Sequence, residues 1–167
     1  NATLYDDLRE VRRHRGRAIE FVKFCDENIF RPLNLEKRYD VCLIGTLTSK
    51  KGQLEFARIA EKTWRIAIVG DQTDKEYVQS IQEILPQAEF FGEVRKTRVN
   101  QILNQSKVSV IFSKKNDACP RIIVESLAAG TPVMIHRRNL GRKYVKPGAG
   151  LICGQFQFRR RLNRMIR

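Results

Sequence analysis

The stretch YDVCLIGTLTSKKGQLEFARIAEKTWRIAIVG (residues 39–70) decides the fold. It opens and closes with short apolar runs, at 39–45 and 64–70, and each run ends on a glycine. Between them, residues 52–62 carry apolar side chains at the spacing of one helical face. A strand, a helix and a second strand in this order predict two parallel strands joined by a right-handed crossover.

The same alternation continues on the C-terminal side of this unit. Further helical patterns lie at 75–85, 98–106 and 121–130, and short strand-like runs at 88–92, 107–113, 132–136 and 150–154. Short apolar strands separated by helices are typical of a parallel sheet that is covered on both faces. The sequence therefore predicts an α/β fold, a Rossmann-like parallel sheet with helices on both faces.

Composition and pattern divide the chain into four segments. The first has Leu4, Leu8 and Val11 at helical spacing, and the second contains Pro32, which interrupts regular structure. The expected segments are a helical N-terminal remnant of a preceding domain (1–25), a linker (26–38), the Rossmann-like domain (39–154) and a basic C-terminal helix (155–167).

The most unusual property of the 167-residue chain is its net charge of +14. Such a charge indicates an anionic partner, either nucleic acid, a membrane surface or a charged small substrate. The basic residues gather at 12–17, 136–146 and 159–167. No apolar run has the length of about 18 residues that a membrane span needs, and the first residues do not form a signal peptide.

The cysteines and histidines suggest neither disulfides nor a metal site. Cys25, Cys42, Cys119 and Cys153 are far apart and form no CxxC motif, so we expect reduced thiols and a cytoplasmic protein. Together with two histidines they have no metal-ligand spacing. We expect no metal and no cofactor.

Two carboxylates flank a predicted helix start in DACPRIIVESLAAGTPV (117–133). Asp117 precedes Glu125 by eight positions, and Pro120 suits the first position of a helix. The two acids could be a catalytic pair, two groups that bind sugar hydroxyls, or unrelated surface residues. Ligands of parallel sheets bind beyond the carboxyl ends of the strands. The loops expected there are 45–52, 70–74, 92–97 and 113–120.

This stretch resembles the signature of the retaining, group 1 (family 4) glycosyltransferases, which have the GT-B fold. Residues 117–120 stand for the first acid of that signature, and ESLAAGTPV (125–133) for its second part. Four more segments resemble family landmarks in the same order: DENIFRP (26–32), GTLTSKKG (45–52), AIVGD (67–71) and FFGEV (90–94).

The resemblance covers residues 26–154 and implies one half of a GT-B fold. That half is the C-terminal one, which binds the nucleotide sugar. The acceptor-binding N-terminal half is then absent from this chain, because residues 1–25 are too few to form it. No catalytic residue can be assigned, since closure against the missing half would assemble the active site.

The resemblance also assigns roles to single residues. Lys51 matches the lysine that binds the diphosphate, with Lys50 beside it, and Glu125 matches the acid that binds the ribose hydroxyls. Asp117 matches the acid that contacts the donor sugar. The implied donor-sugar and phosphate site is Gly45, Thr46, Lys50, Lys51, Asp117, Ala118, Cys119 and Pro120, and the base-side loop is Gly92, Glu93 and Val94.

Three positions depart from the family pattern. Thr46 stands where the family has a phosphate-binding arginine, so that a second cation must come from Lys50 or another residue. Ala118 replaces a glycine, and RRNLGRKY (137–144) lacks an expected acid. We expect these changes to affect the donor site more than the fold.

The expected function is the donor-binding domain of a glycosyltransferase. Its partners would be a nucleoside diphosphate sugar and a polysaccharide, oligosaccharide or lipid-linked acceptor, in the cytoplasm or at the inner face of the membrane. The alternative is a non-enzymatic basic module that binds nucleic acid or a membrane surface. Aromatic residues do not alternate with the basic clusters as base-stacking platforms do, so we expect no nucleic-acid partner. The basic C-terminal helix suits an anionic membrane surface.

Overall fold

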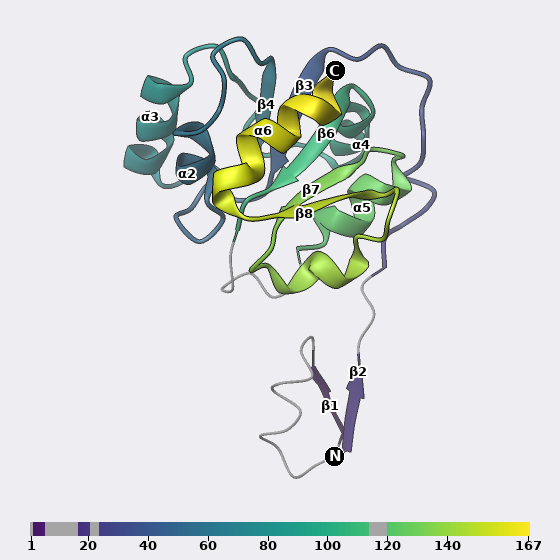
Figure 1. Cartoon of the computed structure of the whole chain (residues 1–167). Coiled ribbons are helices and arrows are strands. Elements are labelled where there is room, and N and C mark those ends of the chain that lie inside the picture. Colours follow the sequence, from purple (N-terminus) through teal and green to yellow (C-terminus); the bar gives the residue numbers. More distant parts are fainter. Residues whose placement is uncertain (1, 6–16, 21–23, 114–119) are drawn as a thin grey trace.

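The computed structural model describes residues 2–5, 17–20, 24–113 and 120–167. At its centre six strands form one sheet in which every neighbouring pair is parallel (Figure 1). The strands are β3 (Tyr39–Ile44), β4 (Ile66–Val69), β5 (Glu89–Phe90), β6 (Ser106–Ile111), β7 (Val133–His136) and β8 (Gly150–Cys153).

The strand order is β5-β4-β3-β6-β7-β8. The chain therefore runs outward from β3 on one side, returns to β6 on the other side of β3, and continues outward to β8. This is the Rossmann order, and its switch point lies between β3 and β6. The prediction of a Rossmann-like parallel sheet is confirmed.

Helices cover both faces of this sheet (Figure 1). On one face lie α2 (Gln53–Ala57), α3 (Lys75–Ile84) and α6 (Gln155–Ile166), and on the other α4 (Lys96–Asn104) and α5 (Ile122–Ala128). A 3₁₀ helix, η1 (Leu140–Tyr144), follows β7. Helix α2 is shorter than the predicted 52–62: after Ala57 the amide of Ile59 donates to the carbonyl of Phe56 three residues back (3.0 Å), and the chain continues as turns. None of the described helices is long and apolar enough to cross a membrane.

The central strands send alternate side chains into two separate cores. On β3, Val41 and Leu43 join the core beneath α2, α3 and α6, whereas Cys42 joins the core beneath α4 and α5. On β4, Ile66 and Ile68 alternate with Ala67 and Val69 in the same way. This is the period of two that a strand imposes, here with both faces buried.

Aromatic rings join α2 and α6 to the end of β6. Phe112, directly after β6, meets Phe158 of α6 edge to face with 4.8 Å between ring centroids. Phe56 of α2 contacts both rings, at 6.0 Å and 6.5 Å. All three side chains are buried, so the helices are held to the sheet mainly by removal of aromatic surface from water.

The N-terminal segment differs from its prediction. Where it is described, it is extended: β1 (Ala2–Tyr5) and β2 (Arg17–Glu20) form a separate parallel pair. The predicted helix would have spanned Leu4, Leu8 and Val11, of which the last two lie outside the described residues. A short helix depends on packing of its apolar face. In residues 2–5 the backbone instead pairs with β2.

The linker is bound to α4 along the second face. Its backbone amides at Arg31 and Leu33 donate to the side-chain oxygens of Asn100 (3.3 Å) and Asn104 (2.6 Å). The amide group of Asn104 also donates to the carbonyl of Arg31 (3.1 Å). These buried asparagines satisfy linker groups that belong to no helix or strand.

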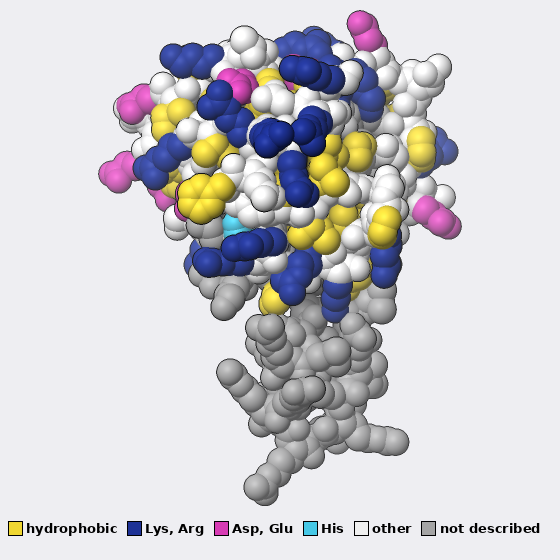
Figure 2. All heavy atoms as spheres, in the orientation of Figure 1, with side chains coloured by type: hydrophobic (Ala, Val, Ile, Leu, Met, Phe, Trp, Pro, Cys, Tyr) yellow, Lys and Arg dark blue, Asp and Glu magenta, His cyan; other side chains and the backbone are white. Residues whose placement is uncertain are grey.

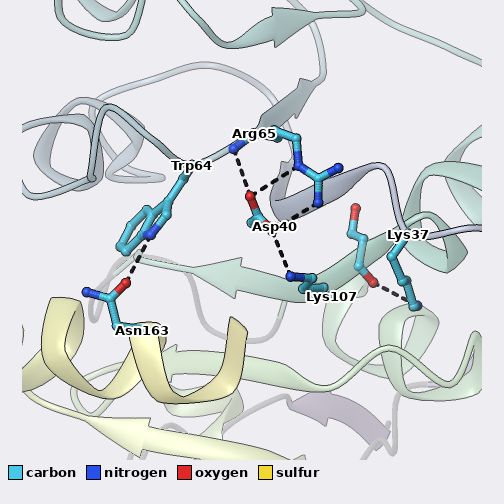
Figure 3. A network of polar contacts seen from close by, with 7 residues as sticks. Lys37, Asp40, Trp64, Arg65, Lys107 and Asn163 are labelled. Carbon is cyan, nitrogen blue, oxygen red and sulfur yellow. Dashed lines mark hydrogen bonds and ion pairs between the residues drawn. The ribbon is translucent and has the colours of Figure 1, made fainter. Parts of the chain in front are cut away.

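An ion cluster holds the amino ends of the three central strands together (Figure 3). Asp40 of β3 accepts from the guanidinium of Arg65, which precedes β4, at 3.2 and 3.3 Å, and from Lys107 of β6 at 3.0 Å. Burial alone would raise the pKa of Asp40. The bonds from Arg65 and Lys107 outweigh burial and lower this pKa to about 2.

Asp40→Asn should therefore lower the free energy of unfolding by about 1–2 kcal/mol at neutral pH, a value reduced for the exposure of Arg65. Because the folded pKa lies below the unfolded one, the stabilisation is full above pH 4 or so and disappears as the pH falls through about 2. Urea unfolding between neutral pH and about pH 3 measures this, with Glu83→Gln on the exposed side of α3 as the control. A difference between wild type and Asp40→Asn that does not shrink on acidification would contradict the assignment.

Candidate functional site

A pocket of about 220 Å³ lies at the carboxyl ends of β3 and β6, on the switch point of the sheet. Its floor is made by the last residues of the two strands, and its walls by the loops that follow them. Parallel strands point their carboxyl ends, and the N-termini of the following helices, at one edge of the sheet. The pocket is therefore where this strand order predicts a ligand site.

Five residues assigned to the donor site from the sequence line this pocket. They are Gly45, Thr46 and Lys51 from the connection after β3, and Pro120 and Glu125 from the region after β6. The two groups are far apart in sequence, and only the pairing of β3 with β6 brings them together.

Other assigned residues lie elsewhere or outside the described part of the chain. Lys50 is exposed and is not among the described residues that line the pocket. Gly92, with Glu93 and Val94 after it, follows β5 at the same edge, where its carbonyl accepts from the amide of Gly70 (2.8 Å), but none of the three lines the pocket. Asp117, Ala118 and Cys119 lie outside the described residues.

The loop at Gly45 and Thr46 is held against the next strand. The amide of Gly45 donates to the carbonyl of Val69 (2.8 Å). At Gly70, φ is +146°, and a Cβ there would clash with the carbonyl oxygen of Gly45. Only glycine at position 70 allows this close approach of the two strand ends, which fixes the loop that lines the pocket.

Gln53 supports the same loop from beneath. Its side-chain amide donates to the carbonyl of Thr46 (3.0 Å), and its oxygen accepts from the hydroxyl of Tyr77 (3.4 Å). Tyr77 in turn accepts from the amide of Leu54 (3.0 Å). Gln53 is 4% exposed, so these bonds satisfy a buried polar side chain and fix the height of the loop. Nothing in the sequence pattern marked Gln53, apart from its place directly after Gly52.

The other wall is fixed to the sheet by buried polar contacts. Ser126 of α5 donates to Ser109 of β6 (2.9 Å), which sets the position of Glu125 beside it. Asn139 donates to the carbonyl and the hydroxyl of Ser113 at 3.1 and 2.9 Å. Ser113 lines the pocket, so the segment 137–144, which departs from the family pattern, supports the site through Asn139.

Glu125 lies between two cavities. Besides the pocket at the strand ends it lines a hollow of about 280 Å³ beside the linker, together with Cys25, Lys96 and Arg121. Burial raises the pKa of Glu125, while the charges of Arg121 and Lys96 act to lower it. Cys25 is a free thiol, as are Cys42 and Cys153, and burial raises its pKa as well.

Arg121 is a charged pocket residue that the sequence reasoning missed, as it missed Gln53. It is exposed, it precedes α5 directly, and it lines both cavities with Glu125. The pocket thus combines two cationic side chains, Lys51 and Arg121, with one carboxylate. This set suits an anionic ligand that also carries hydroxyl groups. The described residues contain no cluster of His, Cys, Asp and Glu that could hold a metal ion.

Comparison with known sequences links the chain to one family. A family model described as "Glycosyl transferases group 1" matches residues 26–167. No match to a curated protein sequence was found.

Solved structures with this fold include three informative proteins. Sucrose-phosphate synthase from Thermosynechococcus elongatus superposes with a TM-score of 0.78 at 16% identity, over 97% of this chain and 47% of that one. The C-terminal domain of the group 1 glycosyl transferase LpcC from Francisella tularensis gives 0.66 and 18%, over 86% and 88%. HepE from Anabaena, in complex with UDP-glucose, gives 0.68 and 17%, over 84% and 44%. The chain thus spans about half the length of two of them, and at these identities the likeness shows the fold.

Gln53→Leu tests the support of the loop without changing side-chain size much. We expect a loss of about 1 kcal/mol in the free energy of unfolding, because Thr46 and Tyr77 lose their partner. Hydrogen exchange of the Leu47 amide, which donates to the carbonyl of Asp71 in the connection after β4, should become faster. Gln82→Leu, on the exposed side of α3, is the matched control. Equal stability and equal exchange in both variants would show that Gln53 does not position the loop.

Proposed function

The chain belongs to the group 1 glycosyl transferases, and from that premise we propose that it is the domain that binds the nucleoside diphosphate sugar. The observation that carries the proposal is the pocket at the switch point between β3 and β6, which is lined by Lys51, Arg121 and Glu125. HepE, a protein of the same fold, has been solved with UDP-glucose, with UDP and with UDP and glucose. A ligand of this class carries the two chemical features that the pocket matches, a diphosphate and a ribose diol.

Two cations bind the diphosphate in this proposal. Lys51 lies in the connection after β3, at the position of the phosphate lysine in the family pattern. Thr46 replaces the arginine of that pattern and carries no charge, but Arg121 lines the same pocket from the connection after β6. Arg121 therefore supplies the second cation, and its planar guanidinium can donate two parallel hydrogen bonds to phosphate oxygens. Positive charge there also stabilises the departing nucleoside diphosphate during sugar transfer.

Glu125 binds the ribose. A carboxylate accepts hydrogen bonds through both of its oxygens, so that one side chain can hold two neighbouring hydroxyls. Glu125 is half-buried at the pocket wall, and its partial removal from water strengthens such bonds. Burial raises the pKa of Glu125, and the positive charges of Arg121 and Lys96 act in the opposite direction, toward the ionised form that only accepts.

The remaining steps of the reaction would need a second domain. We propose that the donor sugar contacts Asp117, that Gly92, Glu93 and Val94 lie on the base side, and that transfer proceeds with retention. The acceptor, a saccharide or a lipid-linked saccharide, would bind to a separate N-terminal domain. Cleft closure between two such domains orients donor and acceptor for reaction, so residues 1–167 bind the donor without transferring it. A cytoplasmic protein at the inner face of the membrane fits a lipid-linked acceptor.

Binding of nucleoside diphosphates tests this function directly. The test is calorimetric titration with UDP, GDP and ADP and with the matching nucleosides. The protein should bind the ligands of one of the three bases, and it should bind the diphosphate more tightly than the nucleoside. Lys51→Ala should weaken diphosphate binding about tenfold or more, the loss of one charge-assisted hydrogen bond, and leave nucleoside binding nearly unchanged. Arg121→Ala should act in the same direction.

Lys50→Ala is the matched control for these variants, because Lys50 is exposed and outside the lining of the pocket. We expect it to bind as wild type does. Equal losses for Lys50→Ala and Lys51→Ala would indicate general electrostatic attraction by a basic protein. Absence of binding for all three diphosphates would refute the proposed function.

Glu125→Gln separates a ribose-binding residue from a structural one. The substitution keeps the size of the side chain but replaces one acceptor oxygen with a donor. Affinity for the ribonucleotide should fall by about 1–2 kcal/mol, and the free energy of unfolding should change little. A 2′,3′-dideoxy nucleotide should bind wild type and variant equally, because it has no diol. If the variant binds the ribonucleotide as tightly as wild type does, Glu125 has no part in ribose binding.

A further inference from the structure

Helix α6 has one face in the core and one face in solvent. Phe158 and Leu162 are fully buried against the sheet, and Asn163 accepts from the indole N–H of Trp64 at 3.1 Å (Figure 3). These contacts fix the rotation of the helix about its axis. Arg160 and Arg164, with Arg167 beyond the last turn, therefore face outward and are exposed.

The positive charge of this outer face is largely uncompensated. Glu61 pairs with Arg159. Among the described residues no acid pairs with Arg160, Arg164 or Arg167. Figure 2 shows Lys and Arg side chains gathered over the face that α6 crosses, with few acidic side chains between them. Repulsion within such a cluster is relieved when an anionic surface covers it.

Apolar side chains are exposed at the same place. Phe156, in the first turn of α6, is 103% exposed, and Ile152, at the end of β8, is 39% exposed. Figure 2 shows hydrophobic side chains between the basic ones on this face. A fully exposed phenylalanine contributes nothing to the core, and apolar groups rimmed by cations are typical of an interaction surface.

Two shallow hollows meet at Phe156. One, of about 470 Å³, is lined by Arg160, Arg164 and Arg167 and also by Glu61, which is paired with Arg159. The second, of about 220 Å³, is lined by Arg137 and Arg138. Phe156 lines both. We use the name basic face of α6 for these six residues: Arg137, Arg138, Phe156, Arg160, Arg164 and Arg167. It offers cationic recesses for phosphate groups on either side of one projecting aromatic ring.

We propose that the basic face of α6 binds the surface of an anionic phospholipid bilayer. Arginines attract anionic headgroups, and a projecting ring inserts at headgroup depth, where its apolar body leaves water. Nucleic acid fits this face less well, since a track for single strands needs several aromatic rings along its length and the face has one. The surface is separate from the donor pocket, so this binding is an activity beyond nucleotide recognition.

Vesicle cosedimentation tests the proposal with the chain as it stands. The probes are vesicles of phosphatidylcholine alone and with about 30 mol% phosphatidylglycerol, at about 0.15 M salt. We expect binding to the anionic vesicles only. The triple variant R160Q/R164Q/R167Q should bind them on the order of a hundredfold more weakly, at about fivefold per arginine. Phe156→Ser should weaken binding at high salt as well as at low salt, because burial of a ring is not screened.

A second triple variant controls for net charge. R58Q/K62Q/K75Q removes three exposed cations from the region of α2 and α3, and it should bind the vesicles nearly as wild type does. Both triple variants should keep their nucleoside diphosphate affinity, since none of the six residues lines the donor pocket. Equal weakening by the two triple variants would overturn the proposal, and so would an absence of vesicle binding by wild type. Tighter binding of polyuridylate than of vesicles, lost in R160Q/R164Q/R167Q, would assign the face to nucleic acid instead.

Discussion

Burial of β3 on both of its faces is the constraint on which the rest of this domain depends. Val41 and Cys42, adjacent on the strand and pointing to opposite faces, are both 0% exposed. A strand buried in this way must have a neighbour on each edge and helices over each face. The chain meets this requirement by running outward through β4 and β5 and returning to β6 on the other side of β3. Because the chain returns to β6, the connections after β3 and β6 diverge at the switch point, and the pocket lies between them.

Charged side chains have different roles at the two ends of the central strands. At the amino ends, Asp40 is surrounded by Arg65 and Lys107, so that charge is neutralised and the strands are held in place. At the carboxyl ends, Lys51 and Arg121 line a pocket, and buried Gln53 and Asn139 hold the surrounding loops through neutral hydrogen bonds. Neutral partners satisfy the backbone there without cancelling the charge that a phosphate ligand requires.

Divergence from the family pattern is local in this chain. The match to the family extends over residues 26–167, yet Thr46 carries no charge where the pattern has an arginine. Arg121 restores a cation to the same pocket from a different loop. In the proposed site such an exchange would keep the attraction for a diphosphate, because this attraction depends on the position of a charge and not on its origin in the chain. A second group of basic residues lies on α6, apart from the residues that line the pocket.

Periodicity by itself determined the parallel sheet and its helices on both faces, and the resemblance to the family signature pointed to Lys51 and Glu125. Both are local properties, since a period of two or 3.6 and a glycine after a strand can be read without knowing what lies opposite. Only the tertiary structure placed Arg121 and Gln53 at the pocket and Lys50 outside it. It also paired residues 2–5 with a second strand, where a helix was expected. Of the neighbouring Lys50 and Lys51, only Lys51 lines the pocket. Gln53 acts through a loop and through Tyr77, 24 positions away. These roles therefore arise only when the chain has folded.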